Sequence, residues 1–106
     1  MYVILLDPAV FQDRSKRVKA LLRSNPNRDP AKPCVYVGMT GLAVQDRFQN
    51  QKAGRKAAWV VKNYGIGLMP ELYEYLNPMS SKVAAQMETV LAENLRAGGY
   101  TVAGGT

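Results

Sequence analysis

Arg47 and Gln51 stand four residues apart in a segment, 44–53, that is expected to form a helix. Val44 and Phe48 share this face and must turn it toward a sheet. Arg47 therefore lies beside the buried stripe, where its planar, always charged guanidinium can bind an anion above the sheet. The same spacing suits an arginine that lays its stem along the core and keeps its charge in water. Both interpretations stay open on the spacing alone.

A second chemically capable group is Glu88, in the segment 81–97, whose apolar residues recur at helical spacing. At about 100° per residue, the stripe expected to be buried consists of Val83, Met87, Val90, Leu91, Asn94 and Leu95. Glu88 falls on the flank of this stripe, where an unpaired carboxylate is costly or gives up its charge. One alternative is an ion pair with Arg47 or a lysine. The other is binding of Mg²⁺ through one carboxylate, with water and phosphate oxygens completing the shell.

Two strands are expected to bring tyrosines toward these side chains. Residues 2–6 form an apolar run with little alternation, which is typical of a central strand covered on both faces, and the run begins with Tyr2. Residues 35–37 favour a strand that carries Tyr36 and ends at Gly38, before a Thr-Gly turn. A strand, a turn and a helix with an inward arginine together indicate a functional site.

The connection between the two strands is expected to contain a helix rich in positive charge. Asp7 suits its N-cap and Pro8 its first position, and the pattern extends to about Leu22. The apolar stripe is thin and leaves outside it the basic residues Arg14, Lys16, Arg17, Lys19 and Arg23. We expect these mainly to form a solvated face, with contact to phosphate as the alternative.

Beyond this helix, the pattern predicts loops, helices and short strands: a loop over 24–33, a helix over 55–64, an edge or kinked strand within 67–76, a helix over 81–97 and a last strand at 100–102. Gly65 and Gly98 stop the two helices, and Pro70 inside the strand segment suits an edge position. Trp59 borders the apolar face of its helix, where packing is favoured over stacking on a base.

Length and composition indicate one domain over residues 1–106, large enough for a single hydrophobic core. The pattern of elements predicts an α+β fold with a small central, mostly antiparallel β-sheet flanked by helices. Fourteen lysines and arginines against eight acidic residues give a formal net charge of +6. A small domain this basic attracts polyanions, of which nucleic acid is the commonest in a cell, although a positive charge also serves solubility.

Several functional classes are excluded by residue usage. Cys34 is the single cysteine, so no internal disulfide can form, and without histidine there is no His or Cys metal cluster and no Ser-His or Cys-His nucleophile pair. The longest apolar runs, 3–6 and 57–61, are too short to span a bilayer, and the first residues lack the features of a signal peptide. We therefore expect a cytoplasmic location.

The ordered set of these residues resembles the GIY-YIG nuclease family over nearly the whole chain. Met1-Tyr2-Val3 stands where the first tripeptide of that family occurs, and Tyr36-Val37-Gly38 closely matches the second. Arg47 stands for the family arginine, and Glu88 for the glutamate that binds metal. Any one of these matches would be weak, whereas their order along the chain is specific.

The resemblance implies a metal-dependent endonuclease that hydrolyses phosphodiester bonds in DNA. Glu88 would hold one Mg²⁺ or Mn²⁺ ion, and Arg47 would bind the scissile phosphate and stabilise its developing charge. Tyr2 would accept the proton of the attacking water, with Tyr36 orienting water or phosphate, provided that nearby cations lower the pKa of the base. The basic residues expected to contact nucleic acid are Lys52, Arg55, Lys56 and Lys62. A protein partner for targeting is a further expectation.

Gln51 leaves a second function open. It stands where many members of the family have histidine, and glutamine forms hydrogen bonds but takes no proton near neutral pH. The alternative to the nuclease is therefore a catalytically inactive nucleic-acid-binding module of the same fold, and a protein interaction domain is a third class. Binding of DNA without cleavage would distinguish the second class from the first.

Overall fold

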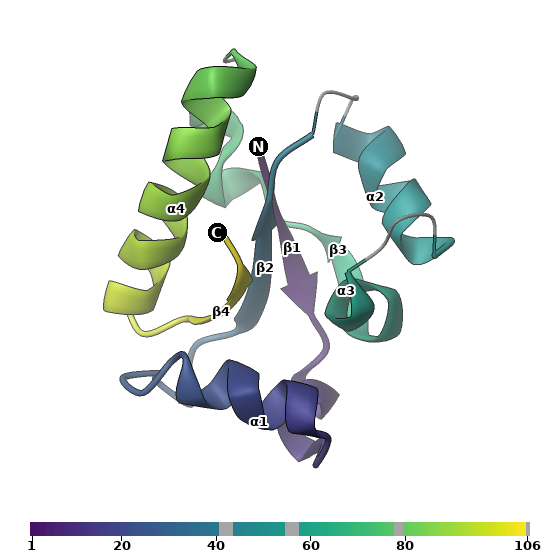
Figure 1. The fold of residues 1–106 in the computed structure, drawn as a ribbon, viewed down its shortest axis with the longest axis vertical. Coiled ribbons are helices and arrows are strands. Elements are labelled where there is room, and N and C mark those ends of the chain that lie inside the picture. The colour runs from purple at the N-terminus through teal and green to yellow at the C-terminus, as the bar shows by residue number, and fades with distance from the viewer. Residues whose placement is uncertain (41–43, 55–57, 78–79, 106) are drawn as a thin grey trace.

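Four strands and four α-helices follow one another in the residues that the computed structural model describes, which are 1–40, 44–54, 58–77 and 80–105. With the short 3-10 helices, the order is β1 Tyr2–Leu6, η1 Pro8–Gln12, α1 Lys16–Arg23, β2 Cys34–Gly38, α2 Val44–Lys52, α3 Trp59–Tyr64, β3 Gly65–Leu68, η2 Pro70–Leu72, η3 Glu74–Leu76, α4 Ser81–Ala97 and β4 Thr101–Gly104. The result is a small α+β architecture in which helices flank a four-stranded sheet, as predicted (Figure 1).

The sheet is mixed, with the strand order β3-β1-β2-β4. β1 pairs antiparallel with both β2 and β3, whereas β2 and β4 run parallel, so two of the three pairings match the predicted antiparallel arrangement. The register sets Tyr2 opposite Gly38 and Ile4 opposite Tyr36. β1 is central and nearly fully buried, which confirms the interpretation of its unbroken apolar run.

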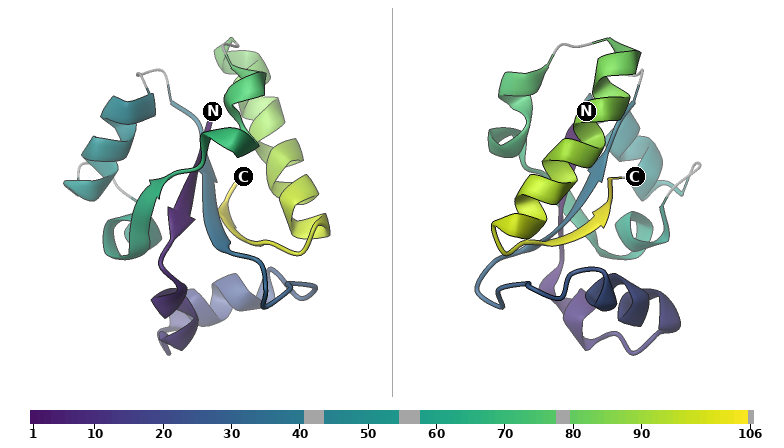
Figure 2. Two further views of the ribbon diagram at one scale, coloured as in Figure 1. Left: turned by 180° about the vertical axis from the view of Figure 1, so that it is seen from behind. Right: turned by 60° about the vertical axis from the view of Figure 1, so that its left-hand side comes forward.

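The helices cover the sheet on both sides and at one end. α4 lies along one side, against β2 and β4, and α2 and α3 lie on the opposite side, near β1 and β3 (Figure 1). α1 crosses one end of the sheet, next to β4 (Figure 2). The buried residues form one cluster between these layers, in which the strands contribute most of the members. None of the helices in the described ranges is long and apolar enough to cross a membrane.

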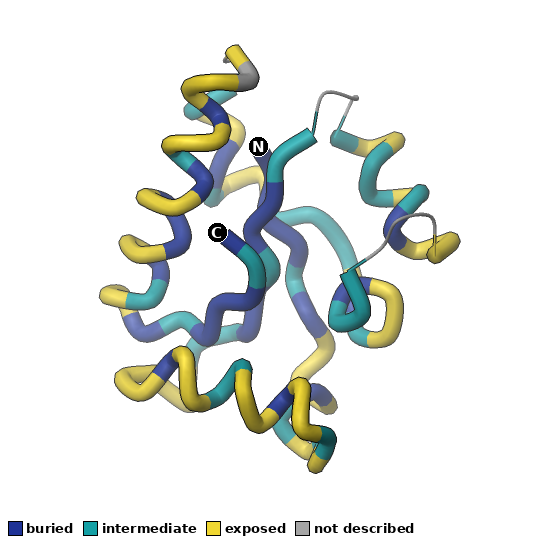
Figure 3. The backbone as a smooth tube through the Cα atoms, viewed as in Figure 1, coloured by how far each residue is buried: buried dark blue, intermediate teal, exposed yellow. Residues whose placement is uncertain are grey.

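The bounds of α4 agree with the prediction, and the predicted buried stripe is confirmed in part, because Leu91 and Leu95 are buried and Met87 is partly buried, whereas Asn94 is exposed. Val83 and Val90 are 44% and 43% exposed, and the side that faces the sheet holds Ala84, Glu88, Leu91, Ala92 and Leu95 (Figure 3). The small side chain of Ala92 lets α4 lie close to the backbone of Gly105. A Cβ added at Gly105 would lie only 2.4 Å from the Cβ of Ala92. Glu88 therefore lies within the buried face and not on its flank.

The single helix predicted over about 8–22 is divided in two. Asp7 caps the first helix as predicted, but the carboxylate of Asp13 then accepts the backbone N–H of Ser15 at 2.7 Å. The hydroxyl of Ser15 in turn accepts the N–H of Val18 at 3.3 Å and starts α1. Short polar side chains that bind nearby backbone groups compete with a continuous helix, which explains the break.

The segments around β3 agree in part with the pattern. α3 ends at Gly65 as predicted, but it begins at Trp59 with Ala58 as its N-cap, and residues 55–57 of the predicted helix lie outside the described ranges. β3 is an edge strand, as expected, and covers Gly65–Leu68. The rest of the segment forms two 3-10 turns, the first of which has Pro70 at its start.

Thr101 in β4 carries a fully buried hydroxyl that lacks a hydrogen-bond partner among the described residues. We expect Thr101→Val to raise the free energy of unfolding, by up to about 1–3 kcal/mol, because it removes an unsatisfied polar group at constant shape. Thr101→Ser keeps the hydroxyl and loses a methyl, so it should lower that free energy by about 1 kcal/mol. Urea denaturation measures the free energy of unfolding of both variants. A Thr101→Val variant less stable than the unchanged chain would mean that the hydroxyl does form a hydrogen bond in the folded protein.

Candidate active site

The two tyrosines named by the sequence lie on the same face of the sheet. Tyr2 and Tyr36 sit on adjacent strands in a diagonal relation, since Tyr2 faces Gly38 across the ladder. Their ring centroids are 6.3 Å apart with the ring planes at 34°. Tyr2 is 2% exposed and Tyr36 is half-buried. The antiparallel register therefore brings together two phenols that lie 34 positions apart in the sequence.

Two glycines leave room for these rings. A Cβ at Gly38 would lie 2.6 Å from Oη of Tyr2 and 3.0 Å from Cε1 of Tyr36. A Cβ at Gly104 would lie 2.8 Å from Cε2 of Tyr36, and the φ of +73° at this residue also favours glycine. The Gly in Tyr36-Val37-Gly38 thus has a packing function, which is to accept the Tyr2 ring against the backbone.

We expect Gly38→Ala to displace the Tyr2 ring and to destabilise the fold by about 1–3 kcal/mol, the usual effect of overpacking a core. Gly67→Ala is the matched control, because Gly67 also lies in a strand but an added Cβ would meet nothing within 4 Å. Thermal unfolding of both variants measures the difference. Equal stability of the two would mean that the space over Gly38 is not needed.

Gln51 connects the tyrosines to the second layer of helices. Its side chain is fully buried, and its Nε2 donates to Oη of Tyr2 at 3.0 Å. Its Oε1 accepts the backbone N–H of Ala58, the N-cap residue of α3, at 2.8 Å. Because Oε1 is held by a backbone donor, the amide is oriented so that its N–H groups point at the tyrosines. The helical spacing of Arg47 and Gln51 predicted this proximity, whereas the backbone partner at Ala58 left no signal in the sequence.

The pKa of Tyr36 is raised above its ordinary value. Burial of the phenol is the main cause, and the nearby Tyr2 and Glu88 act in the same direction. A hydrogen bond with Gln51 and the positive charge of Arg47 oppose this rise. Tyr36 is therefore a protonated hydroxyl at neutral pH and can donate a hydrogen bond. The same effects show that Arg47 from α2 and Glu88 from α4 are within electrostatic reach of one phenol.

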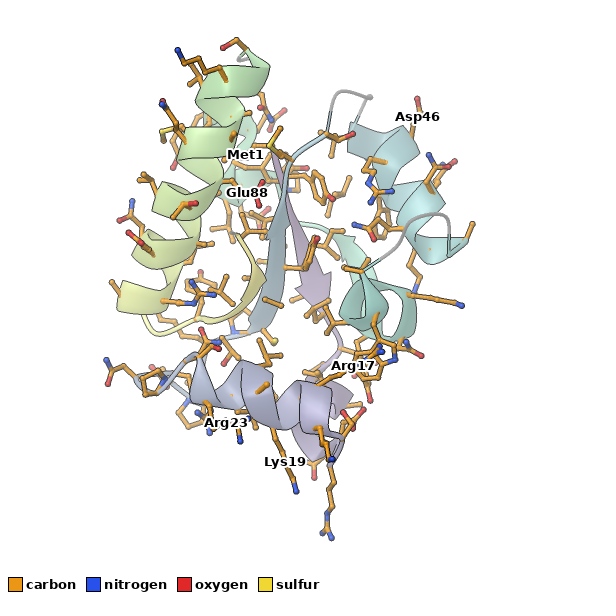
Figure 4. The ribbon with its side chains drawn as sticks, in the orientation of Figure 1. Met1, Arg17, Lys19, Arg23, Asp46 and Glu88 are labelled. Carbon is orange, nitrogen blue, oxygen red and sulfur yellow. The ribbon has the colours of Figure 1, made fainter. Side chains whose placement is uncertain are left out.

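Glu88 is 9% exposed, on the face of α4 that packs on the sheet. Burial raises the pKa of its carboxyl group, and the amino group of Met1 opposes that rise. Met1 lies next to Glu88 in Figure 4, and its amino group also donates to Oδ1 of Asn77 at 3.3 Å. The Met1 amino group is thus a positive group that acts on Glu88, and pairing of Glu88 with Arg47 or a lysine stays a prediction.

A metal ion at this carboxylate would have few protein ligands. No group of three His, Cys, Asp or Glu side chains that could hold a metal lies within the described part of the chain. One carboxylate beside a site open to phosphate suits Mg²⁺ or Mn²⁺, which keep several waters and take substrate oxygens as further ligands. The Glu88 carboxylate has the chemistry of such a ligand, and binding of a metal there stays a prediction. Its raised pKa means that protons and the metal compete for the carboxylate.

The basic residues predicted to bind nucleic acid occupy varied positions. Lys52 donates from Nζ to the carbonyl oxygen of Gly65 at 2.7 Å, which ties the end of α2 to the start of β3. Lys62 is exposed and lies across Gly54, where an added Cβ would be 3.3 Å from its Cε. Arg55 and Lys56 lie outside the described residues. Contact with nucleic acid stays a prediction for all four.

Of the five predicted catalytic residues, Tyr2, Tyr36 and Gln51 from β1, β2 and α2 lie together, and Arg47 of α2 and Glu88 of α4 are close enough for their charges to affect the pKa of Tyr36. Two phenols and a carboxamide are joined by hydrogen bonds, and a cation and a carboxylate act on one of the phenols. No family model matches the chain, and no curated protein or solved structure matches it significantly. The chemistry of these side chains is therefore the basis for assigning a function.

Proposed function

We propose that this chain is a metal-dependent endonuclease of the GIY-YIG type that hydrolyses phosphodiester bonds in DNA. The observation that supports it most is the hydrogen bond from Gln51 to Tyr2 beside Tyr36, with the charges of Arg47 and Glu88 acting on Tyr36. These residues come from four different elements. Their convergence is what hydrolysis of a phosphodiester requires, namely a group to take a proton, a cation for the phosphate and a carboxylate for a metal.

In this proposal the side chains of the protein divide the work of hydrolysis. Arg47 binds the scissile phosphate and stabilises the charge that develops on its oxygens. Tyr2 accepts a proton from the attacking water, and the N–H of Gln51 that donates to its oxygen fixes the position of that oxygen. Tyr36 stays protonated and donates a hydrogen bond that orients the phosphate or the water. Exclusion of solvent around the buried Tyr2 and Gln51 strengthens these interactions.

Glu88 would hold the Mg²⁺ or Mn²⁺ ion. When bound, the ion supplies Lewis-acid polarisation of the phosphate and charge stabilisation at the leaving oxygen. Because Glu88 must be ionised to bind it, affinity for the metal should fall as the pH is lowered toward the raised pKa of this carboxyl. The proposed protein would act in the cytoplasm on DNA, with a further protein as a candidate targeting partner.

The decisive experiment is incubation of single-stranded, duplex and branched DNA with the protein in Mg²⁺ or Mn²⁺ and, separately, in EDTA. Cleavage that requires the metal and is lost in Glu88→Gln supports the proposal. Glu93→Gln is the matched control, because Glu93 lies on the exposed side of the same helix. Absence of cleavage for every substrate in both metals would contradict the nuclease.

One observation favours a second candidate, a nucleic-acid-binding module without catalytic activity. Both polar atoms of the Gln51 amide form hydrogen bonds within the fold, Oε1 with the N–H of Ala58 and Nε2 with Oη of Tyr2. Such a pattern is typical of a residue that stabilises the fold. Glutamine also takes no proton near neutral pH. Binding of DNA in the absence of cleavage, together with cleavage by Gln51→His, would assign the inactivity to this position.

A further inference from the structure

The positive charge of the chain is concentrated in one short segment. Residues 14–23 carry five of the 14 basic residues and none of the eight acidic ones. The rest of the chain is nearly neutral, with nine basic residues against eight acidic ones. A charge that served solubility alone would not need to be collected in this way. The segment corresponds to α1 and the two residues before it.

α1 presents its charge as a stripe that faces away from the core. Val18 is its buried residue, and the partly buried Leu21 and Leu22 lie on the same side. At about 100° per residue, the opposite side holds Lys16, Lys19 and Arg23. All three are exposed, and the labelled side chains of Lys19 and Arg23 extend away from the sheet (Figure 4).

Side-chain contacts connect the N-terminal end of α1 to α3. The guanidinium carbon of Arg17 lies 5.2 Å from the ring centroid of Trp59 in α3, which is a cation–π contact. Tyr64, at the end of α3, donates a hydrogen bond from its hydroxyl to Asp13, just before α1. Trp59 therefore packs between a basic side chain and the edge of Tyr64, as the sequence had favoured.

The C-terminal end of α1 is fixed to β4. The side-chain amide of Asn25 donates to the carbonyl of Val102 at 3.0 Å and accepts its N–H at 2.9 Å. Arg96 donates to both partners, to Oδ1 of Asn25 at 3.1 Å and to the carbonyl of Val102 at 3.2 Å. Arg28 donates to the carbonyl of Leu22 at 3.0 Å. The basic stripe is thus held in a fixed position relative to the sheet.

We propose that the stripe of Lys16, Lys19 and Arg23 on α1 is a second contact surface for duplex DNA, which binds the phosphate backbone outside the candidate active site. This inference rests on the proposed function for its choice of DNA. The seven steps from Lys16 to Arg23 rise about 10 Å along the helix, close to the axial rise of about three nucleotides of one strand. Ala20, at the margin of the stripe, is small enough to let a backbone approach.

The surface is joined to the active site through α3. Trp59, which receives Arg17, directly follows Ala58, the residue whose N–H holds Gln51. DNA bound along α1 would therefore lie on a helix that contacts α3. The N-cap residue of α3, Ala58, in turn holds the Gln51 side chain that donates to Tyr2. Such a surface fixes the register of the substrate without reading its sequence, because phosphate contacts carry no base information.

The experiment measures binding of a fluorescent duplex of about 20 base pairs in EDTA, so that cleavage does not interfere, over a series of salt concentrations. Lys19→Gln/Arg23→Gln should weaken binding and reduce the slope of log affinity against log salt by about one unit for each lost contact. The matched control is Lys32→Gln/Lys82→Gln, which removes the same charge elsewhere and should leave that slope near the original value. Circular dichroism verifies that both variants are folded.

The outcomes separate this inference from the proposed nuclease. A slope and affinity equal to those of the control variant would overturn the role of α1, while metal-dependent cleavage would still stand. Absence of duplex binding by the unchanged chain would also overturn the role of α1, whereas the nuclease is contradicted only if no DNA substrate is cleaved in either metal. Binding to vesicles of equal parts phosphatidylserine and phosphatidylcholine, lost in the α1 variant while duplex binding persists, would assign the stripe to a lipid surface and overturn its role in DNA binding.

Discussion

The Glu88→Gln variant is expected to lose metal-dependent cleavage by about 10²- to 10³-fold or more, a loss of the size found when a charge-stabilising group is removed from an active site. It should also be at least as stable as the unchanged chain at neutral pH, because the amide replaces a carboxylate that is 9% exposed. Activity and stability then change in opposite directions. That combination is typical of a group retained for its function, since a structural partner would lose stability on the same substitution.

The pH dependence of stability has a defined sign. Burial raises the pKa of Glu88 in the folded state above its ordinary value of 4.5, so the folded chain binds this proton more tightly than the unfolded chain. The contribution to the free energy of unfolding is therefore fully present below 4.5 and is lost as the pH rises through the folded pKa. Glu88→Gln should remove this decrease. The amino group of Met1 has a lowered pKa, so its contribution rises with pH just below 8.0.

Thermal unfolding across the acid and neutral range, beside cleavage assays, tests these statements together. Glu93→Gln should retain both the cleavage rate and the original pH profile, because that carboxylate is exposed. Full activity of Glu88→Gln would refute its role as the metal ligand. A variant that unfolds at neutral pH would instead identify Glu88 as a partner that the fold requires.

The second large effect is expected at Gln51. Gln51→Leu leaves the N–H of Ala58 and the hydroxyl of Tyr2 without their amide partner, and a buried polar group deprived of its partner costs about 1–3 kcal/mol. The same change frees the Tyr2 ring, so cleavage should fall as well. Gln49→Leu, on the exposed side of α2, is the matched control and should alter neither property. A stable Gln51→Leu protein would contradict the bridging role.

Gln51→Glu tests the effect of residue 51 on the tyrosine hydroxyls separately from its hydrogen bond to the N–H of Ala58. The carboxylate still accepts from Ala58 but cannot donate to Tyr2, and its negative charge would raise the pKa of the neighbouring phenols. Ultraviolet titration of the tyrosines should therefore show a later ionisation in this variant than in the unchanged chain. An unchanged titration would mean that Gln51 does not govern the phenols.

The extent to which the sequence predicts this structure differs between elements. The bounds of α4 could be predicted because a serine start and a glycine stop are local signals. Its buried face could be predicted only in part: Leu91 and Leu95 are buried as expected, but hydropathy also favours Val83 and Val90, whereas the close approach of the helix to the sheet favours Ala84 and Ala92. That packing depends on residues far away in the chain, such as Gly105.

The candidate site shows the same division. The resemblance to the nuclease family placed Tyr2 and Tyr36 in one site, but the register that sets Tyr2 opposite Gly38 and Ile4 opposite Tyr36 is known only from the structure. The partner of Gln51 could not be found, since it is a backbone N–H, which every residue except proline carries. The break before α1 was missed for a related reason, because Asp13 and Ser15 were read as ordinary helix residues while they bind backbone groups.

The pairing of Asn25 with Val102 has a consequence for the behaviour of the protein in concentrated solution. β4 is an edge strand, and the backbone groups of Val102 face outward, away from β2. The side-chain amide of Asn25 occupies both groups in the manner of a neighbouring strand, and Arg96 reinforces it. Because Asn25 occupies these groups, another chain cannot extend the sheet at Val102, and this edge of the sheet is protected there against edge-to-edge aggregation.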